Sequence, residues 1–406
     1  MVSRNTSYFP KPLDGRLLRK TLFWLHLTTA VCSAVIIVIM AATGALLTYE
    51  RQIVSWLDVR RLDGSPPVAG APALPASEIV ARARAAAKGN PSAVRWRAGT
   101  NAPVEVMFGG GHRVFANAFS GEVLGTGARN ARMFFGTATR LHTSLAVPRK
   151  FWKVGLAIAT AANLALLLLL LSGSVLWWPR RWNVSAFRNV LLFRRGLRSK
   201  ARDFNWHNVI GVWSLVPLFI IVVSGVLISS PRFGAIIDRV VSATTPAAPR
   251  SAVPAREPRP APTMAELDAL IARAKQQDPE WRLLTLQLQP TPRGGILFTL
   301  DRSPGNQPQK RAELVLASNG EVMRWQPFAT QSSSRKVRSV LRFAHTGEVL
   351  GVAGQTIAGL ASAAGVVLAY TGIALALRRW LAWRRRRKDG ARSANRDTRK
   401  RRALTV

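Results

Sequence analysis

The chain has 406 residues, a net charge of +38 and one cysteine, Cys32, which lies inside an apolar segment. A single cysteine excludes an intrachain disulfide and argues against a cysteine-based metal site or a catalytic thiol. We expect Cys32 to be a small apolar packing residue inside the first span. The charge by itself would favour a nucleic-acid partner, but the basic residues are concentrated beside long apolar segments. We therefore expect the chain to contact membrane lipids and to bind no nucleic acid.

Four apolar segments have the roughly 20 residues that a helix needs to cross a bilayer. They lie near residues 22–48, 154–178, 206–230 and 353–377. The first is followed by TYERQIVSW rather than by a small-residue cleavage site, so we interpret it as a retained span. Basic residues are frequent before the first span, between the second and third, and after the fourth, which predicts that these parts are cytoplasmic.

The predicted protein therefore lies in a bacterial inner membrane, with both termini in the cytoplasm and two large loops in the periplasm. In chain order we predict a cytoplasmic N-terminus (1–21), a first span (22–48), a periplasmic module (49–131), a second span with its preceding histidine-bearing segment (132–178), a basic cytoplasmic loop (179–203), a third span (204–230), a second periplasmic module (231–335), a fourth span with its preceding histidine-bearing segment (336–380) and a basic cytoplasmic tail (381–406).

Each large loop is predicted to form a helix and a small antiparallel sheet. In the first loop, ASEIVARARAAAKGN has helical periodicity and is followed by the strand-like stretches AVRWRAG, VEVMFG and HRVFANAF. The second loop repeats this order with TMAELDALIARAKQQ, LLTLQLQ, GILFTLD and AELVLASNGEVMRW. The Pro/Ala-rich stretch at 242–262 is typical of an extended linker.

The spans repeat as well. FWLHLTTAVCSAV matches FNWHNVIGVWSLV, and the interval from His26 to Gly44 equals that from His207 to Gly225. A second pair of segments relates His142 and Gly173 to His345 and Gly372, with intervals of 31 and 27 residues. The predicted fold is therefore a mainly α membrane protein, a four-transmembrane-helix bundle that arises from an internal duplication and carries two periplasmic α+β modules.

Four of the five histidines stand at the start of a span. The topology places His26 and His207 at the cytoplasmic face and His142 and His345 at the periplasmic face. Two imidazoles that face each other in a helical bundle are what a six-coordinate haem b requires. This pattern predicts two haem b groups, each held by two axial histidines.

Glycines on the opposite helices fit this arrangement. Gly44 and Gly225 lie about 27 Å along their helices from the histidines that precede them, which brings them to the depth of His142 and His345. Gly173 and Gly372 reach the depth of the other pair. We expect these glycines to give each porphyrin a smooth wall.

Other interpretations remain open at this point. A single histidine near a membrane interface is more often a polar anchor, and small residues promote helix packing in lipid without any cofactor. Metal transport is a further alternative, although the spans contain no internal acidic residue. We assign no role to His112, which lies in a predicted hairpin.

The residues also resemble a known family. The span patterns W-x-H, L-H-x-x-L and S-G-x-x-L-W, together with FANAFSGEVLG, are similar to the PepSY-associated transmembrane helix family. The resemblance runs from about residue 16 to residue 385. The first module is the better match, and the second keeps only N-G-E-V of the turn motif.

This resemblance implies an iron-regulated, di-haem ferric-siderophore reductase of the inner membrane, with His26, His207, His142 and His345 as haem ligands. The predicted cytoplasmic segments are too short to bind a flavin or a nicotinamide, so we expect the electron donor to be a separate cytoplasmic reductase or a quinol. A periplasmic ferric-siderophore would then be the acceptor. The alternative within this family is a non-enzymatic PepSY protein that binds a periplasmic protease or sensor. Candidate residues for an anionic acceptor are Arg140, Arg149, Lys150, Arg338 and Arg342.

Overall fold

The computed structural model describes residues 15–99, 101–179, 183–229, 264–291, 294–304 and 307–403, together with residues 235, 238–241 and 243. The predicted Pro/Ala-rich linker lies almost entirely outside these residues. The chain divides into two compact units. The helical unit comprises Met1–Ala45, Leu141–Val223 and Leu360–Val406, and the sheet unit comprises Leu46–Arg140 and Ser224–Gly359.

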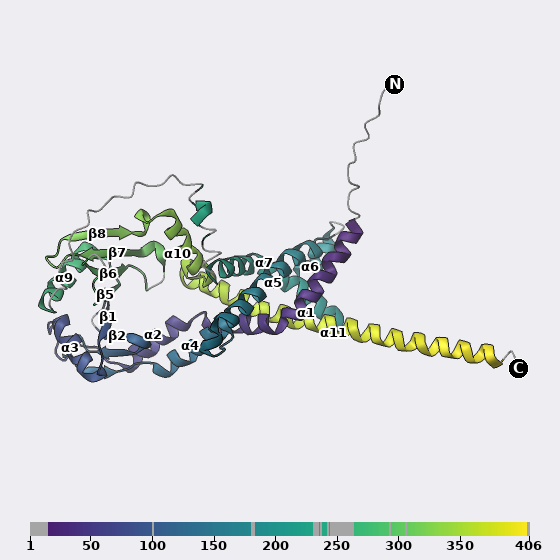
Figure 1. Ribbon diagram of the computed structural model, residues 1–406, viewed down its shortest axis with the longest axis horizontal. Coiled ribbons are helices and arrows are strands. Elements are labelled where there is room, and N and C mark those ends of the chain that lie inside the picture. The colour runs from purple at the N-terminus through teal and green to yellow at the C-terminus, as the bar shows by residue number, and fades with distance from the viewer. Residues whose placement is uncertain are drawn as a thin grey trace, which may run out of the picture. The chain divides into compact units, whose positions relative to one another are not determined.

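Four long helices carry the apolar segments: α1 (Gly15–Leu47), α5 (Trp152–Trp177), α7 (Ser199–Ser229) and α11 (Gly351–Ala403) (Figure 1). Each is long and apolar enough to cross a membrane. Within the helical unit, Leu170, Leu218, Val222 and Ala361 form a buried cluster. Side chains such as Val35 and Val216 remain exposed, as expected for helices that face lipid. The protein is thus a mainly helical membrane protein with four candidate membrane-spanning helices.

Shorter helices flank these spans. Helix α2 (Glu50–Arg61) follows α1 after a turn, and α6 (Val184–Leu191) lies in the basic loop between α5 and α7. Two further helices, α4 (Arg129–Ser144) and α10 (Ser333–His345), precede α5 and α11. His142 and His345 therefore lie at the carboxyl ends of separate helices rather than in the spans themselves.

Cys32 was expected to pack among apolar side chains inside the first span. The structure instead exposes it on the surface of α1. The reason is that α1 has apolar residues around its whole circumference, so the sequence does not identify its buried side. Ala34 and Ile37 are the neighbouring residues that are buried.

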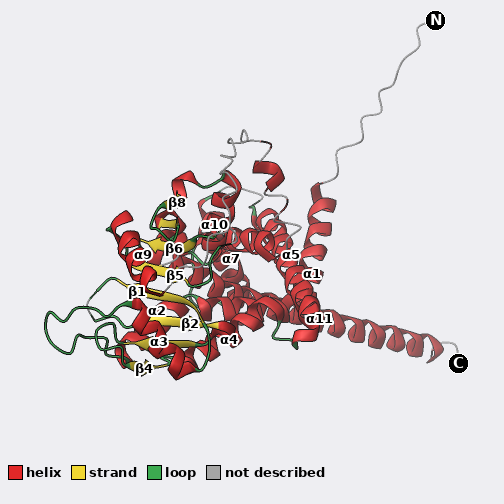
Figure 2. Ribbon diagram, turned by 60° about the vertical axis from the view of Figure 1, so that its left-hand side comes forward, coloured by secondary structure: helices red, strands yellow, loops and turns green. Residues whose placement is uncertain are grey.

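The sheet unit contains one antiparallel sheet of eight strands in the order β4-β3-β2-β1-β5-β6-β7-β8 (Figure 2). The first loop supplies β1 (Pro91–Arg97), β2 (Val104–Phe108), β3 (Arg113–Ala116) and β4 (Val123–Gly125). The second loop supplies β5 (Leu283–Gln287), β6 (Ile296–Asp301), β7 (Arg311–Leu316) and β8 (Val322–Pro327).

The prediction of two separate small sheets is therefore corrected. Strands β1 and β5 pair in antiparallel register from Ala93 opposite Gln287 to Arg97 opposite Leu283. This pairing satisfies the backbone groups of both strands, which would otherwise be unpaired sheet edges. We call the junction of β1 and β5 the seam.

Two helices, α3 (Ala76–Ala87) and α9 (Met264–Gln277), pack against one face of the sheet. Alternate residues of β1 explain this arrangement, because Val94 and Trp96 pack with the helices while Arg95 and Arg97 lie on the opposite face. The two helices are also joined at the amino end of α3, where the Asp268 carboxylate accepts a hydrogen bond from the Ser77 hydroxyl (2.8 Å) and another from the Ala76 backbone N–H.

Candidate functional site

Two of the predicted site histidines lie side by side within the helical unit. His26 on α1 and His207 on α7 have ring centres 6.5 Å apart, and their planes are nearly perpendicular at 86°. Imidazole nitrogens bind metal ions at about 2.0–2.1 Å, so two rings that share one axial metal ion have centres roughly 6–7 Å apart. The observed separation fits a pair of axial ligands.

Hydroxyl groups on the other two helices hold these rings. Ser172 Oγ on α5 lies 2.9 Å from His26 Nδ1, and Thr371 Oγ1 on α11 lies 2.9 Å from His207 Nδ1. Each hydroxyl already donates its single hydrogen to a backbone carbonyl of its own helix, at Leu168 (2.7 Å) and Val367 (2.8 Å). Each therefore accepts a hydrogen bond from Nδ1–H, which leaves a lone pair on Nε2, the form of imidazole that binds a metal.

The glycines contact the imidazoles. A Cβ atom placed on Gly173 would lie 3.4 Å from His26 Cε1, and one on Gly372 would lie 3.6 Å from His207 Cε1. Gly173 and Gly372 thus lie beside the rings of the two histidines whose depth they were expected to share. Their role as a smooth wall for a porphyrin stays a prediction from the sequence.

His142 repeats this arrangement within the helical unit. Its Nδ1 lies 3.1 Å from Thr43 Oγ1 and 2.9 Å from the Met40 carbonyl oxygen, both on α1. A carbonyl only accepts, so Nδ1 is again the protonated nitrogen. A Cβ atom on Gly44 would lie 3.3 Å from His142 Cε1, which places this glycine against the ring in the same way.

His345 belongs to the sheet unit. Its Nδ1 lies 3.4 Å from Ser224 Oγ on α7, next to the buried residue Gly225. Each of the four predicted histidines thus has a serine or threonine hydroxyl at Nδ1. The pairing of His142 with His345 stays a prediction from the sequence.

The hydroxyls are functional candidates that the sequence argument missed. They immediately precede the four predicted glycines, in the dipeptides Thr43-Gly44, Ser172-Gly173, Ser224-Gly225 and Thr371-Gly372. The signal was present in the sequence. It was overlooked because serine and threonine are common in spans, where their hydroxyls usually bond to the preceding turn of the same helix.

The predicted rim residues Arg140, Arg149, Lys150, Arg338 and Arg342 are all exposed. Arg140 donates to the Thr137 hydroxyl, Lys150 lies over the Phe151 ring, and Arg338 forms an ion pair with Asp238. Arg149 and Lys150 belong to the helical unit and the other three to the sheet unit, so their grouping as one rim stays a prediction.

The side chains that commonly bind a metal ion without a cofactor do not gather at one place in the described ranges. No group of three or more His, Cys, Asp or Glu residues lies close enough there to hold one. The two imidazoles at His26 and His207 are instead a pair of nitrogen donors.

The comparisons with known proteins agree with the architecture. The family model described as the PepSY-associated TM region matches residues 23–379, which includes the four spans and both loops. No curated protein matches the chain. Because the matched region covers most of the sequence, the chain belongs to the family of proteins with a PepSY-associated transmembrane region.

Proposed function

We propose that this protein is a membrane oxidoreductase that holds haem b and passes electrons to a periplasmic ferric chelate of the siderophore type. The observation that carries the proposal is the way the histidines are held. His26 and His207 are a fitting distance apart for a shared axial metal, and each has Nδ1 bound to a hydroxyl on a neighbouring helix. An interfacial anchor has no need of this matched arrangement.

His26 and His207 would hold one haem through their Nε2 atoms. A haem with two histidine ligands supplies one-electron transfer when bound. Ser172 and Thr371 would orient the two rings and raise the basicity of Nε2, since a metal-bound histidine commonly donates its other N–H to a fixed acceptor. The small residues Gly173 and Gly372 let the rings lie close to the helix backbones.

A second haem between His142 and His345 is part of the proposal. It rests on the internal duplication of the sequence, in which these residues occupy equivalent positions of the two halves. Their Nδ1 atoms lie near Thr43 and Ser224, so both rings have the same kind of neighbour as the first pair.

The direction of transfer follows from the charge distribution. The basic segments favour an inner-membrane protein with cytoplasmic termini, and they place His26 and His207 toward the cytoplasm. The donor would be a separate cytoplasmic reductase or a quinol. The acceptor would be Fe(III) held by hard oxygen ligands, which bind Fe(II) more weakly, so the gain of one electron loosens the complex and releases Fe(II).

The proposal is tested by purifying the full chain in detergent and recording reduced-minus-oxidised absorbance spectra. We expect a b-type α band and two haems per chain in a pyridine assay. His207→Ala is expected to remove one haem and leave the other. Asn208→Ala is the matched control, because its side chain bonds to the Phe204 carbonyl of the same helix. A wild-type protein without haem overturns the proposal, and loss of both haems in His207→Ala overturns the assignment of the pairs.

A further inference from the structure

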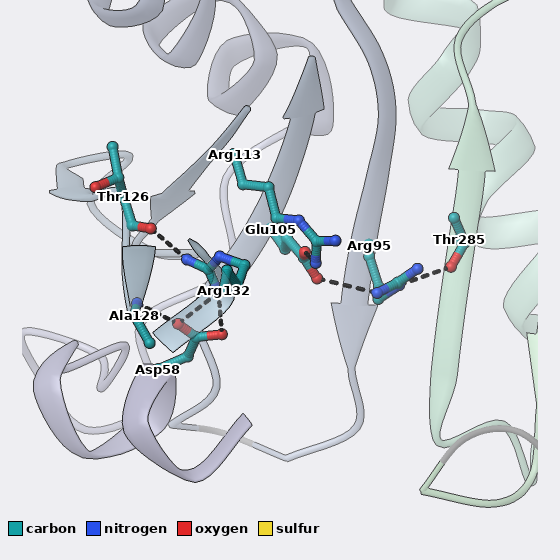
Figure 3. Close-up of polar contacts among 8 residues, drawn as sticks. All are labelled: Asp58, Arg95, Glu105, Arg113, Thr126, Ala128, Arg132 and Thr285. Carbon is teal, nitrogen blue, oxygen red and sulfur yellow. Dashed lines mark hydrogen bonds and ion pairs between the residues drawn. The ribbon is translucent and has the colours of Figure 1, made fainter. Parts of the chain in front are cut away.

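The face of the sheet opposite α3 and α9 carries a row of charged side chains that runs from β3 to the seam. Figure 3 shows Arg113 on β3, Glu105 on β2, Arg95 on β1 and Thr285 on β5 in sequence across the strands. Glu105 accepts hydrogen bonds from both arginines, and Arg95 Nε donates to the Thr285 hydroxyl at 3.2 Å. The Glu105 side chain is only 5% exposed, so a buried carboxylate is shared by two guanidinium groups.

Arg97 adds a third positive charge on this face. It follows Arg95 by two residues on β1 and is half-buried. Burial lowers the pKa of its guanidinium, while the nearby carboxylates of Glu105 and Asp58 act in the opposite direction. Among the residues that the structure describes, Arg97 has no ion-pair or hydrogen-bond partner for its side chain. Both nearby carboxylates are paired with other arginines, Glu105 with Arg95 and Arg113 and Asp58 with Arg132.

A half-buried arginine without a direct partner is costly for the protein alone. Partial burial removes water from a cation, and the loss is best compensated when an opposite charge forms a direct pair with it. Glu105 and Asp58 lie near Arg97 but form their ion pairs with other arginines. The Arg97 guanidinium is thus available to an anion from outside the chain.

A hollow of about 290 Å³ opens beside Arg95 and Arg113, near the lower end of the size range of small-molecule sites. Arg97 is not one of its lining residues, but it follows Arg95 by two residues on the same face of β1. Both loops contribute to it, so the hollow exists because β1 and β5 pair. It is lined by Ser92, Ala93, Arg95, Met107, Phe108, Gly111, His112, Arg113, Thr285 and Gln287. His112, to which the sequence argument gave no role, lies at this hollow with its ring against Phe108.

We propose that the seam, with Arg95, Arg97 and Arg113 and the adjacent hollow, is a binding site for an anionic chelate whose metal is wrapped in carboxylate or catecholate oxygens. The planar guanidinium of arginine matches two-oxygen groups of this kind, and hydroxyl and amide side chains at Thr285 and Gln287 offer further hydrogen bonds. This inference rests on the proposed function and names its substrate class. A neutral hydroxamate chelate would gain little from the arginines.

The test measures binding without electron transfer. Gallium(III) citrate and a gallium(III) tris-catecholate serve as anionic probes, a neutral gallium(III) tris-hydroxamate serves as the contrast, and inorganic phosphate serves as a simple oxyanion. Isothermal titration calorimetry on the full chain in detergent is expected to show binding of the anionic chelates. The affinity is expected to fall with added salt, because screening weakens attraction between partly exposed charges.

Arg97→Gln is the informative variant because it breaks no hydrogen bond or ion pair among the described residues. It is expected to weaken binding of the anionic chelates by at least about tenfold, since a charge-assisted hydrogen bond to the chelate is lost. Arg97→Lys is expected to retain part of the affinity. Arg324→Gln is the matched control, because Arg324 is an exposed arginine on β8 that pairs with Glu313.

Three results would overturn this inference: wild-type affinity in Arg97→Gln, equal binding of the neutral chelate, or binding of phosphate as tight as that of the chelates. The unfolding midpoint of each variant shows whether a loss reflects misfolding, and Arg97→Lys provides a second, charge-retaining variant for the same comparison. The haem spectra are independent of this titration. A haem-free protein that binds the chelates refutes the reductase proposal alone, and a haem protein that binds none refutes this site alone.

Discussion

The Nδ1 atom of His207 and the Oγ1 atom of Thr371 lie 2.9 Å apart, and Thr371 Oγ1 also donates to the Val367 carbonyl of its own helix. This chain of two hydrogen bonds fixes both the rotation of the ring and the nitrogen that carries the proton. The same relation joins His26 to Ser172. A serine or threonine one residue before a glycine is thus the local unit that holds each histidine of this pair.

Thr371→Val is expected to weaken haem binding at the His26/His207 site by roughly 10–100-fold, the usual effect of removing a partner of a metal-ligating histidine. It is also expected to raise the midpoint potential of that haem, because an imidazole without a hydrogen-bond acceptor at Nδ1 donates less electron density to Fe(III). Redox titration followed by absorbance measures the potential. Thr371→Ser keeps the hydroxyl and should behave as the wild type. A midpoint potential in Thr371→Val equal to that of the wild type would contradict the role assigned to this side chain.

Substitution of Gly173 tests the space beside His26. Alanine is expected to be tolerated, because its Cβ atom would lie 3.4 Å from His26 Cε1, an ordinary contact distance. Leucine is expected to displace the ring and abolish one haem, since its larger side chain needs the volume that the ring occupies. The pyridine assay gives the haem count. Retention of both haems in Gly173→Leu would show that the glycine is not needed at this contact.

Much of this geometry could be predicted from the sequence. The helix and the strands of each loop lie where their periodicity places them, and the rise of a helix is regular enough to bring Gly173 to His26 and Gly372 to His207 from counting alone. The four apolar segments were recognisable because a membrane requires long runs without charge.

Other features depend on contacts that no local pattern records. Ala93 and Gln287 are paired across the seam although the whole of the second and third spans lies between them in sequence. Periodicity identifies a strand without identifying its neighbour. The rotation of each helix about its axis is likewise not predictable when apolar residues lie on all of its sides. Cys32 therefore proved exposed, and Gly173 proved to contact a histidine ring.

Asp268→Ala tests the link between the two halves of the sheet unit. The Asp268 carboxylate accepts from Ser77 and from the backbone N–H of Ala76 at the amino end of α3, where helices leave such groups without partners. Its loss is expected to lower the free energy of unfolding by about 1–2 kcal/mol. Thermal unfolding followed by tryptophan fluorescence is suitable, because Trp96 and Trp281 pack against the same core.

Asp268→Asn retains a carbonyl oxygen that can accept one of these bonds, so its unfolding midpoint should lie between those of the wild type and Asp268→Ala. An alanine variant as stable as the wild type would mean that water satisfies the end of α3 equally well.

Substitution of Gly155 tests how closely α5 packs against the end of α4. A Cβ atom at Gly155 would lie 2.2 Å from the Ser144 backbone oxygen and 2.7 Å from Val147 Cγ2, so Gly155→Ala requires α5 and the end of α4 to move apart. The substitution is expected to lower the free energy of unfolding by about 1–3 kcal/mol, as at other overpacked sites. The His142 ring near Ser144 should shift as the two helices move apart. Gly354 has the equivalent contact with the Gly347 oxygen in the second half.

The matched control is Gly136→Ala on α4, where a Cβ atom would meet nothing within 4 Å. Alanine in an exposed helix interior is expected to stabilise it by about 0.5–1 kcal/mol relative to glycine, so the two substitutions should change the unfolding midpoint in opposite directions. Detergent-solubilised protein is heated while circular dichroism is recorded. Equal midpoints for the two variants would rule out the close contact between Gly155 and Ser144, because only that contact gives the same substitution opposite effects at the two sites.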